Sequence, residues 1–440
     1  MKNDKSIHVH HLTRVEGHGD IVARIKDGVV EEVRFDIVEA PRFFEMFLRG
    51  QHYRQVVHVA PRICGICSVS HKCAALKATE SALGVEPSDQ TVLLRRLAFH
   101  GEVIGSHILH IYFLAAPDFV GVNSIFDMAG TDREAVLRGM RLKRLGYEIC
   151  ETVAGRHTHP VAMKVGGFSF VHSVEDLGKL RKQLIGAMDD IRETAKLFAT
   201  FEIPRFERDT EYVALTDPDT YALYDGDVTS SRGGRIPASQ YRDAIEEYVL
   251  PTSTAKHARW KGPHYMVGAL ARLNTNFQQL SPLAKEIARD LKLEPPCRNP
   301  FLNTAAQIVE CAHCVEDSVA IVDRLCDAGI KAEDELAPVK AGPGSGVGAV
   351  EAPRGTLFHE YHYDESGICQ WANQVIPTGQ NLANLDADMR AIVPSIADSE
   401  EDFIRRRLET LVRAYDPCIS CSAHVVRVER EGSHRSDSRK

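Results

Sequence analysis

The spacing of apolar and polar residues divides the chain into a short β-structured beginning and a longer, mainly helical remainder. Residues 19–25 and 29–38 are alternating runs joined by the turn signal Lys26-Asp27-Gly28, which predicts a β-hairpin. Beyond Ser88, apolar residues recur at helical spacing over 90–115, 133–150, 173–199, 270–292, 304–329 and 399–414. The third of these helices begins at a candidate N-cap, Ser173, and its apolar face consists of Leu177, Leu180, Leu184, Met188 and Ile191. The pattern predicts an α+β fold that is mainly helical, with a core of long helices and an N-terminal antiparallel hairpin.

Two other stretches carry weaker signals. Residues 204–262 are polar and show no regular period. The glycine-rich segment GPGSGVGAV at 342–350 is not followed by Lys-Ser or Lys-Thr, as a phosphate-binding loop requires, so we interpret it as a surface connection. Because no internal repeat and no clear linker divides the chain, residues 1–424 are predicted to form a single domain.

Composition and charge narrow the class of protein. The 440 residues have a formal net charge of -8 and no block of lysine or arginine, which argues against nucleic-acid binding. By our interpretation no stretch reaches the length of a membrane helix, and the first 19 residues lack the apolar segment of a secretory signal. We therefore expect a cytoplasmic protein without a membrane span.

The eleven cysteines include three C-x-x-C pairs, and these are not equivalent. Cys311 and Cys314 lie inside an apolar-periodic run, where cysteine commonly serves as a small buried residue. The outer pairs lie beside helix-breaking residues, where side chains can be aimed at a common point. Four thiolates at one point suit zinc, an iron-sulfur cluster or another thiophilic metal. A local zinc unit is disfavoured because the two outer pairs are separated by roughly 350 residues. These outer pairs are Cys64 with Cys67 and Cys418 with Cys421.

Five motifs, in this order, resemble those of the large subunits of nickel-iron hydrogenases. They are RVEGH at 14–18, RICGICSVSH at 62–71, APRG at 352–355, VPS at 393–395 and DPCISCSAH at 416–424. The resemblance spans essentially the whole chain and implies the fold of those subunits and reversible cleavage of H2. It implies that Cys64, Cys67, Cys418 and Cys421 hold nickel. By the same resemblance, Cys67 and Cys421 also bridge to an iron that carries carbonyl and cyanide ligands.

The resemblance also implies roles for residues around the metals. Glu16 would relay the proton released by H2 cleavage, since burial can raise the pKa of a carboxyl to suit that task. Arg354 would lie above the metals with Asp416 as its anion, and His71 would form hydrogen bonds near a bridging sulfur. Ser395 would contact a cyanide.

A second metal site, holding magnesium or iron, is also implied by the resemblance. Its ligands would be Glu45, His424 and the backbone carbonyl of Ala391. This site would hold the C-terminus in place.

Departures from the motifs bear on the electron acceptor. Many membrane-bound members have an aspartate where this chain has Ser106, so an acidic partner for Arg354 from that helix is missing. The stretches GSHILHIYFLAAPDF, STAKHARWKGPHYMVGALARLN and IPTGQNLANLDADMR resemble the cytoplasmic, cofactor-coupled branch. The implied partners are a diaphorase-like module that reduces NAD(P) and an iron-sulfur small subunit. Alternatives are a deazaflavin-reducing or heterodisulfide-reductase-coupled enzyme, a non-catalytic H2 sensor, and a structural subunit of the complex I type.

The polar tail after His424 has its own expected role. Residues 425–440 include eight charged side chains, whose unpaired burial costs several kcal/mol each, so the tail cannot enter the interior with the cysteines. We interpret it as a propeptide that keeps the site open while nickel-insertion proteins act. A maturation endopeptidase would then cut between His424 and Val425.

Overall fold

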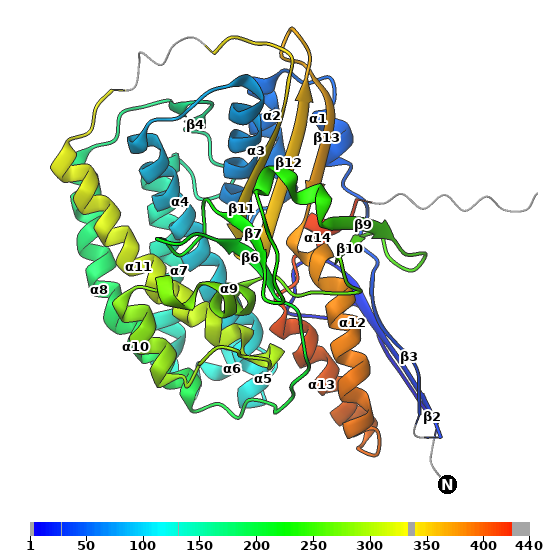
Figure 1. The fold of residues 1–440 in the computed structure, drawn as a ribbon. Coiled ribbons are helices and arrows are strands. Elements are labelled where there is room, and N and C mark those ends of the chain that lie inside the picture. The colour runs from blue at the N-terminus through cyan, green and yellow to red at the C-terminus, as the bar shows by residue number, and fades with distance from the viewer. Residues whose placement is uncertain (1–3, 28, 131, 333–338, 425–440) are drawn as a thin grey trace, which may run out of the picture.

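The computed structural model describes residues 4–27, 29–130, 132–332 and 339–424. A bundle of long helices occupies one side of the molecule, and the smaller sheets lie on the other side with the helices closest to the C-terminus (Figure 1). This arrangement confirms the predicted mainly helical α+β fold. The long helices are α3 (Ser68–Leu83), α4 (Asp89–Ile108), α7 (Arg133–Ala154), α8 (Val174–Ala199), α11 (Asn303–Ala328), α12 (Pro377–Ile396) and α13 (Glu401–Ala414).

Seven shorter helices lie before, between or after these long helices in the sequence of the described residues. They are α1 (Phe44–Leu48), α2 (Tyr53–Val59), α5 (Ala116–Val120), α6 (Ile125–Met128), α9 (Ala269–Asn276), α10 (Pro282–Asp290) and α14 (Ile419–Ser422). Short 3₁₀ helices are η1 (Ala60–Ile63), η3 (Ala238–Asp243), which is kinked at Gln240, η4 (Phe277–Gln279) and η5 (Pro300–Leu302), and η2 (Leu109–Ala115) is a π-helical segment.

Helix α4 runs through the middle of the bundle. It packs against α7 and α11, and α11 packs in turn against α8. Together with η2 and α5 it forms a helical run, Asp89–Val120, that is long and apolar enough to cross a membrane, contrary to our expectation from the sequence. Its most apolar window is 67% buried inside the protein, as in a core helix. The apolar character of this run is therefore accounted for by the bundle interior.

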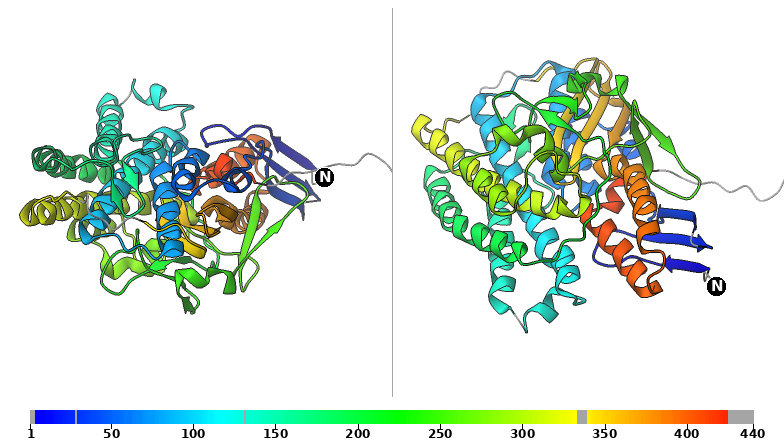
Figure 2. Two further views of the ribbon diagram at one scale, coloured as in Figure 1. Left: turned by 90° about the horizontal axis from the view of Figure 1, so that it is seen from above. Right: turned by 60° about the horizontal axis from the view of Figure 1, so that its bottom comes forward.

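The N-terminal hairpin is confirmed and extended by one strand. Strands β1 (Lys5–Val9), β2 (Gly19–Lys26) and β3 (Val29–Ile37) form an antiparallel sheet in that order. One face of the sheet is buried, with Ile7 and Ile21 on it, because alternate residues of a strand point to opposite faces. The sheet lies beside α12 and α13, which Figure 2 shows as the blue strands next to the orange and red helices.

Two sequence predictions were wrong in detail. The helix expected over 270–292 is two helices, α9 and α10, because Pro282 has no amide hydrogen and begins α10 after an extended Ser281. The region 204–262, in which we saw no regular period, contains short antiparallel strands that pair with their neighbours in sequence, β6 with β7 and β7 with β8, and β9 with β10. They are β6 (Val213–Thr216), β7 (Asp227–Ser230), β8 (Arg235–Ile236), β9 (Ile245–Val249) and β10 (Lys256–Trp260). A further two-residue pair is β4 (Met163–Lys164) with β5 (Gly167–Phe168).

The glycine-rich segment is a buried strand and not the surface connection that we expected. Strand β11 (Gly344–Ala352) pairs with β12 (Gly355–Tyr363), which pairs with β13 (Cys369–Val375). A Cβ atom placed on Gly344, Gly346 or Gly348 would lie 1.9, 2.2 or 2.1 Å from a backbone oxygen of α3. Alternate glycines therefore let β11 lie directly against α3, the helix that begins at Cys67.

Gly348→Ala should destabilise the protein, because the added methyl group would meet backbone that cannot move aside like a flexible side chain. We expect a loss of about 3 kcal/mol, seen as a lower thermal unfolding temperature and reduced soluble yield. Ser345→Ala, at an exposed position of the same strand, is the matched control and should be nearly neutral. Equal unfolding temperatures for the two variants would contradict this account of β11.

Candidate metal centre

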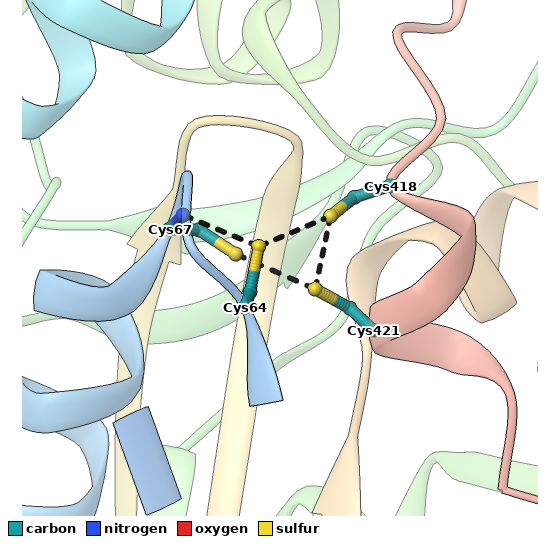
Figure 3. Close-up of side chains that lie close together, drawn as sticks. All are labelled: Cys64, Cys67, Cys418 and Cys421. Atoms are coloured by element: carbon teal, nitrogen blue, oxygen red, sulfur yellow. Dashed lines mark hydrogen bonds between the residues drawn. The ribbon is translucent and has the colours of Figure 1, made fainter. Parts of the chain in front are cut away.

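Four sulfur atoms from opposite ends of the chain meet in the interior (Figure 3). The Sγ of Cys64 lies 3.4 Å from that of Cys418, and the Sγ of Cys67 lies 3.6 Å from that of Cys421. The Sγ atoms of Cys418 and Cys421 are 2.9 Å apart. All four residues are buried, and none forms a disulfide.

Local backbone geometry aims each pair at this point. Cys64 follows the short helix η1, and Cys67 is the N-cap of α3, so the two flank a turn and not a continuous helix. The amide groups of Ile66 and Cys67 donate to the Sγ of Cys64. Before the second pair, Asp416 has a φ of 50°, a left-handed conformation rare in residues with side chains, and α14 begins after Cys418.

The chemistry of this donor set fits a bound cation. Hydrogen bonds from the other three thiols, that of Cys418 foremost, lower the pKa of Cys64 well below its ordinary value. The same contacts, led by that with Cys421, raise the pKa of Cys418 well above its ordinary value. Without a positive charge, four thiolates cannot share this buried space. All four ligand atoms lie within 4.8 Å of one another, close to the separation of about 4.6 Å or less for sulfurs bound to one ion at about 2.3 Å.

A buried ion pair lies next to the sulfurs. Arg354 donates through Nε to the backbone oxygen of Asp416 at 2.7 Å and through a terminal nitrogen to its carboxylate at 2.9 Å. Burial would lower the pKa of Arg354, but Asp416 and the neighbouring sulfurs raise it well above its ordinary value. The other terminal nitrogen donates to the Ser106 hydroxyl at 3.2 Å, so the serine noted in the sequence fills the place next to the guanidinium. Arg354 is thus a fixed cation at the site.

Glu16 is brought to the C-terminal cysteine pair by backbone and side-chain contacts. Its backbone oxygen accepts from the Ile419 amide at 2.9 Å, and its carboxylate accepts from the amide and the hydroxyl of Ser420. Gly17 permits this approach: its φ is 87°, and a Cβ there would lie 2.7 Å from the Cβ of Ile419. The RVEGH motif is therefore a contact surface for the segment that contains Cys418.

His71 lies one helical turn beyond Cys67, and its ring contacts another histidine. Its Nδ1 is 2.9 Å from Nε2 of His359, whose Nδ1 is 2.6 Å from the Tyr361 hydroxyl. Burial lowers the pKa of His71 to about 4, so the ring is neutral at physiological pH. The hydrogen bond of the His71 ring is thus with His359 of the β11–β13 sheet and not with the sulfur of Cys67.

A lysine lies beside Glu45, where the second metal site is expected. The ammonium group of Lys256 lies 2.9 Å from the carboxylate of Glu45 and 3.0 Å from that of Glu247, and it also contacts Asn373 at 3.2 Å. Burial would raise the pKa of Glu45, but Lys256 and then His424 hold it below its ordinary value. Lys256 and the Gln374 amide both bond Oε1 of Glu45, so a side chain supplies positive charge beside this carboxylate. The second metal site therefore stays a prediction.

Ser395 and Ala391 do not reach the site, so these two sequence predictions need correction. Both are exposed in the last turns of α12, and the Ser395 hydroxyl donates to the Ile392 carbonyl. Thr378, on the same helix, does reach the site, and its hydroxyl accepts from the Cys418 amide at 2.9 Å. Thr378 and Ser395 are 17 residues apart on one helix, or roughly 25 Å. The sequence signal was the IPT triplet at 376–378, at the start of α12.

Sequence reasoning also missed Glu102. This buried residue of α4 accepts from the amides of Val69 and Ser70 at the start of α3 and from the Ser70 hydroxyl. Burial raises its pKa to about 8. Its only sequence signal was a single acid inside an apolar helix. Glu102 fixes the first turn of α3, immediately after Cys67.

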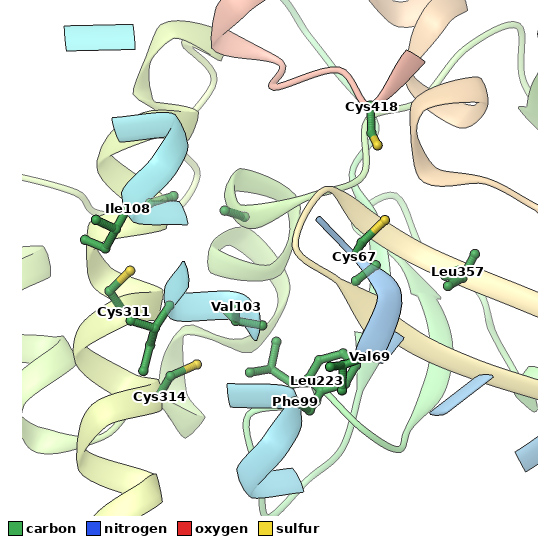
Figure 4. Packing of buried hydrophobic residues seen from close by; sticks show 14 of the residues in the cluster. Cys67, Val69, Phe99, Val103, Ile108, Leu223, Cys311, Cys314, Leu357 and Cys418 are labelled. Atoms are coloured by element: carbon green, nitrogen blue, oxygen red, sulfur yellow. The ribbon is translucent and has the colours of Figure 1, made fainter. Parts of the chain in front are cut away.

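The middle cysteine pair is packed in the core, as predicted. Cys311 and Cys314 are fully buried in α11 among apolar side chains that include Val103 and Ile108 of α4 (Figure 4). Burial raises the pKa of both thiols well above the ordinary value. They are therefore protonated, apolar contacts.

Comparisons with known proteins agree with this geometry. The profile described as nickel-dependent hydrogenase matches residues 42–137 and 208–424. The chain is 35% identical to the alpha chain of sulfhydrogenase 1 of Pyrococcus furiosus over 425 residues, covering 96% of this chain and 98% of that one. It is 30% identical to a chain of the F420-non-reducing hydrogenase of Methanothermobacter thermautotrophicus over 454 residues, covering 94% of each chain.

A solved structure gives the same result. The crystal structure of an NAD+-reducing [NiFe]-hydrogenase in the H2-reduced state matches with a TM-score of 0.84 and 29% identity, covering 96% of this chain and all of that one. Two pairs of cysteines that meet only through this fold, and matches that span the chain, lead to one conclusion. The chain belongs to the nickel-dependent hydrogenase family and is the large subunit of an oxidoreductase that acts on H2.

Proposed function

We propose that this chain cleaves H2 reversibly and heterolytically at a nickel-iron centre held by Cys64, Cys67, Cys418 and Cys421. The convergence of four buried thiols without disulfides carries the proposal. Nickel would be bound by all four sulfurs, and an iron with carbonyl and cyanide ligands would share those of Cys67 and Cys421. When bound, this centre supplies an electron-accepting metal with an open position, unlike a zinc site closed by four cysteines.

The proton leaves through residues of this chain. Cys418 is proposed to take the proton at Sγ, and the Glu16 carboxylate to carry it outward. The contacts of Glu16 with Ile419 and Ser420 hold the carboxylate against the segment that contains Cys418 and support this role. Glu16 is half-buried, so it connects the interior with the surface.

Arg354 and Thr378 position the site without exchanging protons. The guanidinium is held by Asp416 and Ser106, so its charge stays in one place beside the sulfurs. Thr378 fixes the backbone of Cys418 and is the hydroxyl that we propose for the role first expected of Ser395. His71 is proposed to hold the first turn of α3 against the β11–β13 sheet through His359.

Electrons are proposed to leave through an iron-sulfur small subunit. Within the described residues, the only other group with metal-ligand geometry is His8 with His10 and Asp20, which contains no cysteine. A diaphorase-like module that reduces NAD(P) is our first choice for the next step, supported by the similarity to the NAD+-reducing enzyme. A second candidate is a sulfur-related acceptor, favoured by the name of the sulfhydrogenase relative. Assay of H2-dependent reduction of NAD+, NADP+, sulfur and deazaflavin by the purified complex distinguishes them.

The proposal also covers how the chain matures and where the enzyme is located. Residues 1–424 would be one domain in the mature cytoplasmic enzyme, because a single buried cluster includes residues from Ile7 of β1 to Cys421 of α14. Residues 425–440, which lie outside the described residues, would be removed by an endopeptidase after nickel-insertion proteins have acted. A magnesium or iron ion beside Glu45 and His424 stays a prediction, and it would share the Glu45 carboxylate with Lys256, which bonds one of its oxygens.

Cys418→Ser should abolish H2 oxidation and strongly reduce retained nickel, because an alcohol is a poor replacement for a soft, readily ionised thiol. Metal analysis should show roughly one nickel per chain in the wild type. Cys311→Ala is the matched control, since Cys311 belongs to the packed pair and should keep its nickel. Zinc in wild-type protein from nickel-replete cells, with no infrared bands from carbonyl or cyanide, would overturn the assignment.

Glu16→Gln should leave the metals assembled but block proton exit, because an amide keeps the size of the carboxylate and cannot carry a proton. We expect H2 turnover and exchange of deuterium with solvent to fall by roughly 100-fold or more. Ortho/para conversion of hydrogen, which needs cleavage but no exit, should decline less. Glu39→Gln, in a carboxylate bonded to His18 on the surface, is the control. Unchanged isotope exchange in Glu16→Gln would remove this residue from the mechanism.

Intact mass spectrometry should find that the active, nickel-loaded chain ends at His424. The backbone amide of His424 bonds the Thr254 carbonyl at 3.0 Å, so the final described residues are tied into the interior next to the cysteines. Protein made without nickel should retain residues 425–440. A fully active, nickel-loaded chain that still ends at Lys440 would refute processing.

A further inference from the structure

A second cluster of metal-ligating side chains lies on the N-terminal sheet, apart from the cysteines. Strand β1 pairs with β2 so that Val9 lies opposite Ile21, which places His10, directly after the strand, next to Asp20. His8 precedes His10 by two residues and therefore points to the same face. Ile7 and Ile21 cover the opposite, buried face, so the two histidines are exposed to solvent, and the Asp20 side chain beneath them is 14% exposed.

The three side chains are arranged around one point. Nδ1 of His10 is 3.3 Å from Oδ2 of Asp20, and Nε2 of His8 is 3.8 Å from the same oxygen. One ligand atom from each residue lies within 4.8 Å of the others. The His11 amide donates to the other oxygen, Oδ1, at 2.9 Å, which orients the carboxylate with Oδ2 toward the two imidazoles.

We propose that His8, His10 and Asp20 form a binding site for one divalent transition-metal ion of the zinc and nickel type. Two imidazoles and one carboxylate match the ligand preference of these ions, whereas magnesium and calcium prefer oxygen ligands alone. The side chains of His8 and His10 are 45% and 65% exposed, so an ion can enter from solvent and keep water in its remaining positions. The site does not depend on the function proposed for the cysteines.

The position of the site gives the ion a structural effect. His10 and Asp20 are the two ends of the loop that contains Glu16, and the Leu12 amide bonds the Gly19 carbonyl across its base at 3.0 Å. Farther along, Arg14 contacts Asp118 and the Leu114 carbonyl. An ion that joins residues 8 and 10 to residue 20 would close the base of this loop and reduce its opening.

The first test measures metal bound by the assembled, nickel-loaded complex, in which the four cysteines are already occupied. After incubation with excess Zn²⁺ and desalting, the wild type should retain one zinc per large subunit that the double variant His8→Gln/His10→Gln lacks. Ni²⁺ should compete with the zinc, and Mg²⁺ should not. Control substitutions in histidines that face a single carboxylate, His157→Gln and His362→Gln, should retain it. Equal zinc in the wild type and the double variant would overturn the site.

The second test measures the effect on the loop. Hydrogen exchange of backbone amides in residues 10–18 should slow on addition of Zn²⁺ in the wild type and stay unchanged in the double variant. The double variant should keep the wild-type thermal unfolding temperature without zinc, because both histidines lie on the exposed face. Zinc bound at full stoichiometry with no slowing of exchange would refute the closing of the loop.

Discussion

The position of the C-terminal segment, residues 416–424, determines everything else about the site. The segment supplies two of the four sulfurs of the site, and these must meet the two from residues 64–67. The segment therefore has to run through the interior, where each backbone amide and carbonyl needs a partner. Those partners come from distant parts of the chain: the Ile419 amide bonds Glu16, and the His424 amide bonds Thr254. The Ala423 carbonyl accepts from Arg42 at 2.9 Å. The N-terminal sheet is therefore part of the scaffold of the metal centre.

Charge in this interior is matched pair by pair. Arg354 and Asp416 are both almost fully buried, and truncation of either would leave the other charge unpaired at a cost of about 3–5 kcal/mol. Gln307 donates to the second oxygen of Asp416 at 3.0 Å, so the carboxylate is held from two sides. Elsewhere in the interior, the ammonium group of Lys256 joins the carboxylates of Glu45 and Glu247. The same physical need, a positive charge beside buried carboxylates, is met there by a side chain.

Close contact between backbones is the second recurring feature. Gly17 lets the loop that contains Glu16 contact Ile419, and the alternate glycines of β11 let the β11–β13 sheet contact α3. Both contacts bear directly on the cysteines, since α3 begins at Cys67 and Ile419 follows Cys418. Small residues thus bring ligands from separate elements to one point.

The sequence by itself determined the helical core, the hairpin and the four cysteines, because helical periodicity and short spacings are local properties. It also placed Glu16, Arg354 and Asp416 in the site through motifs that surround them. Only the tertiary structure showed that GPGSGVGAV is a buried strand, since glycine spacing reveals close packing only when the opposing helix is known. The same holds for Thr378 and Ser395: both follow a proline, and only the course of α12 decides which hydroxyl reaches Cys418. Lys256 was likewise invisible, because its carboxylate partners lie 9 and 211 residues away and meet it only in the folded chain.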